Sequence, residues 1–467
     1  MPHPTRPQRE ILRLDASGLA SASPESRGPD LDLAPASVLL ERDPTESGPI
    51  RRRQTVLAVG NPFEINAHPA NAAARRVDLL GSFLLPGLVN AHTHLDLSAL
   101  GPIEHDPDEP FEHWLGRVRS GRETTDHAIA AAVSTGIELC VRGGVVAVGD
   151  IAGAPDGRPS AVPLKVLARS SLAGVCYAEF FAMGRARQRG LDGIRALCAR
   201  MGEEVPGEDC AIRPGLQPHA PYSVEPEAYK ASVELARDHG LPLATHLAET
   251  LDERVFVAQA TGPRRGFLEH LGLWEDRLIG ELGTGRHPVE HLGGVLRAAS
   301  DAGYPFLCAH VADLGSGAQR DALIEVLVRA RAHPVYCPRS SAYFATERDL
   351  GPHPYRDMLD AGLPVALGTD SVLNLTRRAE LGSIDGSSHG LSPLDEMRLL
   401  FRRDGTDAGT LLAMATRHGA VALGLDPSRV SLVEGARPLG VLAVEVSAGD
   451  GPALGRVLNS DKAVRFL

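Results

Sequence analysis

Short apolar runs alternate with longer segments of helical period between residues 85 and 425. Such alternation indicates repeated strand–helix units and a parallel sheet. Eight runs qualify as strands: Leu84–His94, Val145–Asp150, Leu172–Phe180, Ile212–His219, Pro242–His246, Phe306–His310, Pro334–Pro338 and Pro364–Asp370. Eight strands, each followed by a helix-like stretch, match an α/β fold of the (β/α)8 TIM-barrel type. We therefore predict a barrel over residues 85–425.

The two chain ends have a different pattern. Residues 1–84 contain three short strand-like runs among Ser, Pro, Asp and Gly, at Ser37–Leu40, Gln54–Val59 and Arg76–Leu80. The helical period stops near residue 425, and three further strand-like runs follow at Val430–Val433, Val441–Val446 and Arg456–Asn459. Strands at both ends predict one small β-sandwich, built from residues 1–84 and 426–467.

Several of the predicted barrel strands end on a His or an Asp. In (β/α)8 barrels the carboxyl ends of the strands form the active-site face. The first run ends with His92 and His94, and residues i and i+2 of a strand lie on the same face. Two imidazoles on one face suit a divalent metal ion. Two histidines can also occur on one strand by chance, so other strands must support the assignment.

Four more polar residues follow at later strand ends. His246 ends the fifth run, His310 ends the sixth, and Asp370 ends the eighth on an otherwise apolar strand. A buried lone Asp is costly unless it is paired or bound to a metal. Glu249 lies just past the fifth strand, where it can move protons without being a ligand.

The order of these residues resembles the amidohydrolase superfamily, with His-x-His on strand one, His on strands five and six, and Asp on strand eight. The lead-in Leu-Pro-Gly-Leu-Val-Asn-Ala-His-Thr-His at residues 85–94 is typical of that superfamily. Three more segments look like its deaminase branch, which includes S-adenosylhomocysteine, guanine and aminofutalosine deaminases. They are Gln217-Pro-His219-Ala-Pro-Tyr222, His246-Leu-Ala-Glu249 and Cys337-Pro-Arg-Ser340.

The resemblance implies one divalent metal ion, held by His92, His94, His246 and Asp370, with zinc expected and iron as the alternative. Two-metal relatives often bridge their ions with a modified Lys at the end of strand four. This sequence has no Lys between Lys165 and Lys230, which favours a single metal ion.

The resemblance also implies a division of labour during catalysis. Asp370 would accept the proton of the attacking water, and Glu249 would protonate a ring nitrogen and then the leaving amine. His310 would lie near the metal ion but outside its ligands, where it would stabilise developing charge.

Four residues are candidates for substrate binding, each with a structural alternative. His219 and Tyr222 follow strand four, where related deaminases contact substrate, although His219 could instead be a structural histidine. Trp114 lies at the end of the predicted loop 97–114, which could cover the substrate or lie on the surface. Arg339 could bind an anionic group or pair with a carboxylate. Ser341 replaces the Asn that relatives carry, which puts the substrate rather than the catalysis in doubt.

The resemblance implies a hydrolytic deaminase that acts on an amino group of a purine-type ring, with aminofutalosine as the first compound to try. The alternative enzyme is a hydrolase of another bond, such as a chlorohydrolase or a cyclic-amide hydrolase. A non-enzymatic metal-binding scaffold is disfavoured, because it would not need Glu249 or His310.

Composition excludes some partners. The formal net charge of −11 over 467 residues argues against a nucleic-acid-binding face, which needs clustered basic charge. No apolar run is long enough to span a bilayer, and residues 1–10 lack the apolar segment of a signal peptide. Six scattered cysteines predict reduced thiols. We expect a cytoplasmic protein with a small-molecule substrate and no nucleic-acid or membrane partner, and we consider a homodimer as its assembly.

Overall fold

The computed structural model describes residues 9–25, 30–46, 48, 50–51, 53–109, 111–204, 210–375, 390–446 and 452–467. The chain divides into two units. The first comprises residues 1–90, 139–147 and 377–467, and the second comprises residues 91–138 and 148–376. Every residue of the candidate site lies in the second unit. The domain boundaries near residues 84 and 425 stay predictions.

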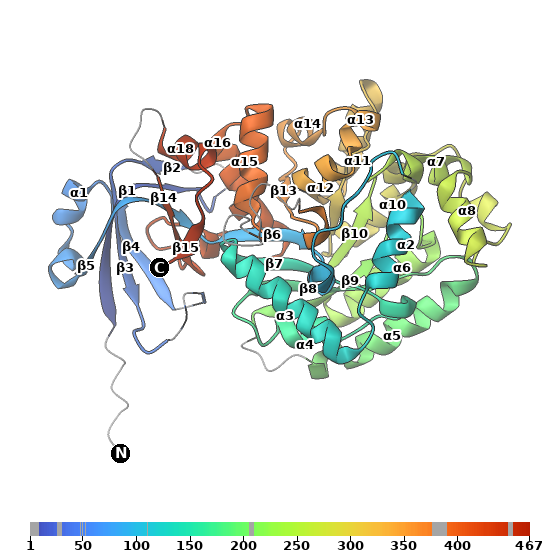
Figure 1. Cartoon of the computed structure of the whole chain (residues 1–467), viewed down its shortest axis with the longest axis horizontal. Helices are drawn as coiled ribbons and strands as arrows, with labels where there is room; N and C mark the ends of the chain where they lie inside the picture. The colour runs from blue at the N-terminus through green and yellow to red at the C-terminus, as the bar shows by residue number, and fades with distance from the viewer. Residues whose placement is uncertain are drawn as a thin grey trace, which may run out of the picture. The chain divides into compact units, whose positions relative to one another are not determined.

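One sheet of eight strands forms the predicted barrel (Figure 1). Its strands follow chain order: β6 (Leu88–Thr93), β7 (Val145–Ala152), β8 (Ala173–Phe180), β9 (Ile212–Pro218), β10 (Leu243–Leu247), β11 (Phe306–His310), β12 (His333–Tyr336) and β13 (Ala366–Leu367). Pairing from β8 to β13 is parallel. An isolated parallel bridge between Thr93 and Asp370 joins the two ends of the series. The predicted barrel is therefore confirmed.

Helices connect the barrel strands, as the helical period of the intervening segments predicts. They are α2 (Phe111–Gly121), α3 (Asp126–Arg142), α4 (Val162–Leu167), α5 (Arg187–Glu204), α6 (Pro226–His239), α7 (Leu251–Gln259), α8 (Pro263–His270), α9 (Leu278–Glu281), α10 (Pro288–Asp301), α11 (Ala318–Arg329), α12 (Pro338–Tyr343), α13 (Thr346–Leu350) and α14 (Tyr355–Asp360). Their ends carry recognisable signals. Pro226 opens α6 and Gly240, at φ 69°, closes it, because Pro suits the first helical turn and Gly adopts left-handed backbone without strain.

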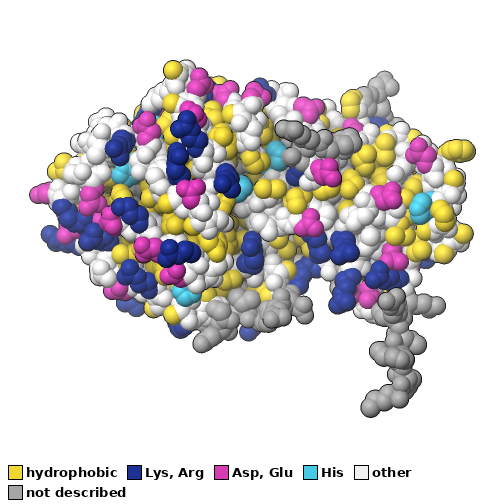
Figure 2. Space-filling model, turned by 180° about the vertical axis from the view of Figure 1, so that it is seen from behind, with side chains coloured by type: hydrophobic (Ala, Val, Ile, Leu, Met, Phe, Trp, Pro, Cys, Tyr) yellow, Lys and Arg dark blue, Asp and Glu magenta, His cyan; other side chains and the backbone are white. Residues whose placement is uncertain are grey.

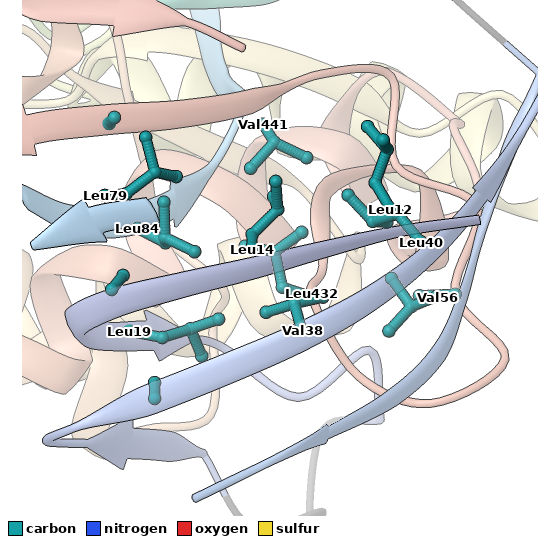
Figure 3. Close-up of a cluster of buried hydrophobic side chains, with 14 residues drawn as sticks. Leu12, Leu14, Leu19, Val38, Leu40, Val56, Leu79, Leu84, Leu432 and Val441 are labelled. Carbon is teal, nitrogen blue, oxygen red and sulfur yellow. The ribbon is translucent and has the colours of Figure 1, made fainter. Parts of the chain in front are cut away.

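The chain ends share a second sheet of seven strands, as predicted. The strands are β1 (Glu10–Ser21), β2 (Leu31–Leu33), β3 (Ala36–Arg42), β4 (Gln54–Gly60), β5 (Arg75–Pro86), β14 (Val441–Glu445) and β15 (Val464–Phe466). The order is β15-β14-β5-β1-β3-β4, with β2 beside β1. Antiparallel pairing of β14 with β5 joins the two ends of the sequence. Side chains of this sheet gather in one buried cluster with Leu432 (Figure 3).

Several details of the second sheet differ from the sequence analysis. The 12-residue strand β1 was not predicted, because Arg13 and Asp15 interrupt its apolar pattern. Both are buried and pair with each other, with Nε and Oδ1 2.8 Å apart. The short strands β2 and β15 were not predicted either. The strand predicted at Val430–Val433 is wrong, since a 3-10 helix ends at Val430 and residues 431–433 form no strand.

The strand predicted at Arg456–Asn459 is also wrong, because this segment belongs to helix α18 (Ala453–Asn459). Its buried residues Ala453, Leu454, Val457 and Leu458 recur with the spacing of one helix face. The remaining helices of this unit are α1 (Pro62–Asn66), α15 (Pro393–Asp404), α16 (Ala408–Ala413) and α17 (Gly419–Ala422).

Surface charge, cysteine state and helix hydrophobicity can be compared with the expectations from composition. The face drawn in Figure 2 intersperses acidic and basic side chains. All six cysteines are free thiols, and five of them are buried. Within the described parts of the chain, no helix combines the length and apolar character needed to cross a membrane.

Candidate metal centre and cavity

Four of the predicted ligands converge at the carboxyl ends of the barrel strands. His94 Nε2 lies 3.3 Å from His246 Nε2. Asp370 Oδ1 lies 3.7 Å from His92 Nε2 and 3.7 Å from His94 Nε2. His92, His94 and Asp370 offer ligand atoms that all lie within 4.8 Å of one another, and His246 adjoins this group through His94. Residues 278 positions apart in the chain (92 to 370) are thus brought together.

The chemistry of this cluster fits a cation. His92 is fully buried, and neither of its ring nitrogens has a hydrogen-bond partner among the described residues. Burial is the largest cause that lowers the pKa of His92, His94 and His246, and neighbouring imidazoles add to the shift for His94 and His246. Neutral rings present lone pairs, and a metal ion needs deprotonated ligands. A buried set of imidazoles and one carboxylate is thus suited to one divalent metal ion.

A hydrogen bond fixes the orientation of His246. Its Nδ1 lies 3.0 Å from the His219 carbonyl oxygen. A carbonyl oxygen only accepts, so Nδ1 carries the ring proton and Nε2 presents its lone pair to the cluster. Ligating histidines are commonly held in this way through their second nitrogen.

Asp370 lies three residues beyond the short strand β13, with φ at 60°. The backbone N–H groups of Thr369 and Asp370 both donate to the His92 carbonyl oxygen at 3.1 Å, and Ser340 Oγ donates to Asp370 Oδ2 at 2.6 Å. Burial would raise the pKa of Asp370, but the adjacent His92 and His310 outweigh it and lower the pKa below its usual value. The carboxylate is therefore held ionised in a fixed orientation.

Left-handed backbone recurs at these strand ends. Ala248, His310 and Val311 have φ values of 52°, 71° and 50°, a conformation that costs a non-glycine residue about 1–3 kcal/mol when it is held. Each of the three lies at or next to the end of β10 or β11. Strained backbone of this kind is common at functional sites, where a side chain must point toward the site and not in the direction that regular strand geometry gives it.

Glu249 and His310 lie beside the cluster. His310 Nε2 is 3.7 Å from Glu249 Oε1, and the His310 ring centroid is 5.4 Å from that of His92 and 5.5 Å from that of His246. His92, His246 and His310 also form a group whose donor atoms could hold an ion together. The structure therefore brings His310 and Glu249 next to the ligand group.

Comparison with known proteins agrees with this arrangement. A model described as the amidohydrolase family matches residues 83–437. The chain belongs to the amidohydrolase family. The aminodeoxyfutalosine deaminase of Deinococcus radiodurans is 30% identical over 348 residues, which cover 68% of this chain and 70% of that protein.

Two solved structures share the fold of this amidohydrolase. The aminofutalosine deaminase of Helicobacter pylori has a TM-score of 0.70 at 20% identity, over 98% of each chain. An adenosine deaminase of Xanthomonas campestris with bound zinc has a TM-score of 0.66 at 20% identity, over 97% of this chain and 91% of that one.

A cavity of about 410 Å³ opens beside the metal-ligand cluster of the amidohydrolase. His94, His246, His310, Asp370 and Glu249 line one part of it. The remaining wall is largely apolar and includes Leu115, Val118, Phe181, Met183, Phe267 and Phe344. No lysine is found among the described residues that line the cavity.

The predicted substrate-binding residues divide into two groups. His219, Tyr222 and Trp114 line the cavity, and Arg339 is not among the described residues that do. The prediction of a loop at Trp114 is wrong, because this residue belongs to helix α2. Its Nε1 donates to the Tyr343 hydroxyl at 3.0 Å.

Sequence reasoning missed the four arginines of the cavity wall, which are Arg119, Arg122, Arg189 and Arg264. Arg264 of α8 is only 3% exposed, lines the cavity, and lies over the Tyr222 ring with its guanidinium carbon 4.3 Å from the ring centroid. No motif surrounds Arg264, so the sequence offered no signal for it.

Glu253 was also missed, although a signal was present. Its carboxylate accepts hydrogen bonds from the backbone N–H groups of Ala248, at 2.8 Å, and Glu249, at 2.9 Å. Thr250 caps the following helix by accepting from the Glu253 N–H. The spacing Thr250-x-x-Glu253 is a helix-start pattern, which could have shown that Glu253 organises the turn on which Glu249 lies.

Proposed function

We propose that this amidohydrolase is a metal-dependent deaminase of a purine-type ring. The observation that carries the proposal is the position of Glu249. Its carboxylate lines the cavity beside His310, next to the metal-ligand cluster. A hydrolase that removes an amine needs a proton donor at this place. The name of the Deinococcus relative supports the same chemistry.

The residues divide the reaction as follows. When bound, a divalent metal ion lowers the pKa of its water from about 15.7 toward 7 and so supplies a nucleophile at neutral pH. Asp370 accepts a proton from the attacking water, because its carboxyl group is held ionised. Glu249 donates a proton to the ring nitrogen beside the attacked carbon, regains one from the hydroxyl that has been added to that carbon, and passes it to the leaving amine. His310 stabilises the charge that develops on the attacking oxygen.

Zinc is the metal ion that we propose for this site. Imidazole nitrogen and carboxylate oxygen are ligands that zinc accepts in catalytic sites, with a further position left for water. The zinc bound to the Xanthomonas adenosine deaminase supports this choice. Iron is the alternative, because imidazole also suits iron.

The substrate that we propose is an amino-purine nucleoside, with aminofutalosine as the first candidate. Glu249 can protonate one neighbouring nitrogen, which fits a 6-aminopurine, where N1 adjoins C6. The rest of the ligand would extend over His219 and Tyr222, which line the cavity. Arg264 rather than Arg339 is suited to an anionic end of the ligand, because Arg264 lines the cavity and Arg339 does not.

Ammonia release by metal-replete protein from a panel of amino-purines tests this proposal. We expect ammonia from 6-aminopurine nucleosides and none after the metal ion is removed. If no amino-purine releases ammonia, the proposal is overturned and the site is assigned to a chlorohydrolase or a cyclic-amide hydrolase. Chloride release or ring opening would then separate these two.

A further inference from the structure

A buried carboxylate without a described role lies in the cavity wall. Glu179 is the last residue but one of β8, is 2% exposed and lines the cavity. Its Oε1 has no hydrogen-bond partner among the described residues. Burial raises the pKa of Glu179 to about 7, and Arg122 opposes this rise. Because an unsatisfied buried acceptor costs about 1–3 kcal/mol, this oxygen is suited to a donor that arrives with the ligand.

His219 faces the same point. Its Nε2 lies 3.9 Å from Glu179 Oε1, and its Nδ1 lies 2.6 Å from Ser223 Oγ. The Ser223 hydroxyl lies closer to Nδ1, at 2.6 Å, than to the Ala220 carbonyl oxygen, at 3.2 Å. We therefore assign the hydroxyl proton to the shorter contact and the ring proton of His219 to Nε2.

An acceptor and a donor thus face the cavity 3.9 Å apart. This distance is too long for a direct hydrogen bond. A hydroxyl oxygen at about 2.8 Å from each can satisfy both, because it donates to one group and accepts from the other. An amine only donates and an unprotonated ring nitrogen only accepts, so neither atom alone can serve both groups.

We propose that Glu179 and His219 together bind the 2′- or the 3′-hydroxyl of the sugar of a nucleoside substrate. The inference rests on the proposed function, since it takes a purine nucleoside as the ligand.

The pair adjoins the place where the ring reacts. The ring centroids of His219 and His246 are 4.9 Å apart, and Glu179, His219 and His246 offer polar atoms within 4.8 Å of one another. A nucleoside whose reacting carbon faces the metal-ligand cluster therefore extends past this pair. The sugar is the part of an adenine nucleoside that carries hydroxyls.

The test compares hydroxyl removal with carboxylate removal. We would measure kcat/KM for ammonia release from adenosine, 2′-deoxyadenosine and 3′-deoxyadenosine, using the metal-loaded full chain and its Glu179→Gln variant. At a pH well above 7, where Glu179 is ionised, one deoxy compound should show a kcat/KM with the wild type that is about tenfold to a hundredfold lower, the range for a hydrogen bond to a charged group. The kcat/KM of Glu179→Gln on adenosine should be lower than that of the wild type by the same factor. On that deoxy compound the variant should have nearly the same kcat/KM as the wild type, because both changes remove the same hydrogen bond.

Glu227→Gln is the matched control. It makes the same change on an exposed side chain of α6, which pairs with Lys230, and it should keep wild-type values on all three compounds. If Glu179→Gln does not fold, Glu179→Asp replaces it. Asp keeps the charge, but its side chain is one methylene shorter, so its oxygens lie farther from the ligand. The same pattern of kcat/KM values is expected.

Three results would overturn the assignment. Equal kcat/KM of the wild type on all three nucleosides overturns it and leaves the proposed function standing. An equal loss by the Glu179 variant on all three also overturns it, because the carboxylate then acts on the ring or on the fold. Absence of ammonia from every nucleoside overturns the proposed function, and this assignment with it.

Discussion

His94 and His246 place two ring nitrogens 3.3 Å apart in a buried environment where both rings are neutral. Both Nε2 lone pairs then face the same point, and a shared cation makes that approach favourable. His94→Ala should therefore lower metal content as well as activity, because the remaining ligands hold the ion less tightly. Elemental analysis of the purified variant checks this. His270→Ala, on an exposed position of α8, should keep both metal and activity.

Variants of Arg264 and Arg339 test which of the two arginines binds an anionic group of the substrate. Arg264→Gln should raise KM about tenfold or more for a nucleoside that carries a carboxylate, the size of a lost charge-assisted hydrogen bond. A neutral analogue should lose much less. Arg339→Gln should change neither value, because the structure does not place Arg339 in the cavity wall. Steady-state kinetics with the two substrates provides the measurement, and a larger effect at Arg339 would contradict the placement.

The turn after β10 depends on one buried side chain. Glu253 accepts the N–H groups of Ala248 and Glu249, and a Gln in its place can accept at only one oxygen. Glu253→Gln should reduce the free energy of unfolding by about 1–3 kcal/mol, the cost of an unsatisfied buried group. It should also lower kcat more than metal content, since Glu249 loses its position while the ligands stay in place. Denaturant unfolding, kinetics and metal analysis of one preparation separate these effects, and an unchanged kcat would remove Glu253 from this role.

The sequence could predict those strands and helices whose apolar pattern is visible within a single short segment. Apolar runs ending on His92, His246, His310 and Asp370 predicted both the barrel strands and the cluster, because strand ends meet on one face of a barrel. β1 was missed, because its buried Arg13–Asp15 pair looks polar in sequence. Arg264 could not be predicted, since its place in the cavity follows from how α8 packs and not from any motif around it.

The predicted metal ligands come from distant parts of the barrel. His94 follows β6, His246 belongs to β10, and Asp370 follows β13 beside the bridge to Thr93. An ion that binds the folded chain and not the unfolded chain stabilises it by about 4 kcal/mol at a thousand times its Kd. Metal removal should therefore lower Tm, and stoichiometric zinc should restore it. Thermal unfolding with and without chelator measures the shift, and an unchanged Tm would contradict a metal centre that joins these strands.

The function of Glu249 as proton donor is tested by the substitution Glu249→Gln. The substitution keeps the shape of the side chain but removes the proton that the ring and the leaving amine must receive. Turnover for ammonia release from a 6-aminopurine nucleoside should fall by about a hundredfold or more, while metal content and substrate binding stay at wild-type values. His310→Ala should lose turnover in the same way and also retain metal. A Glu249→Gln variant that keeps near-wild-type turnover with a full complement of metal would contradict the account.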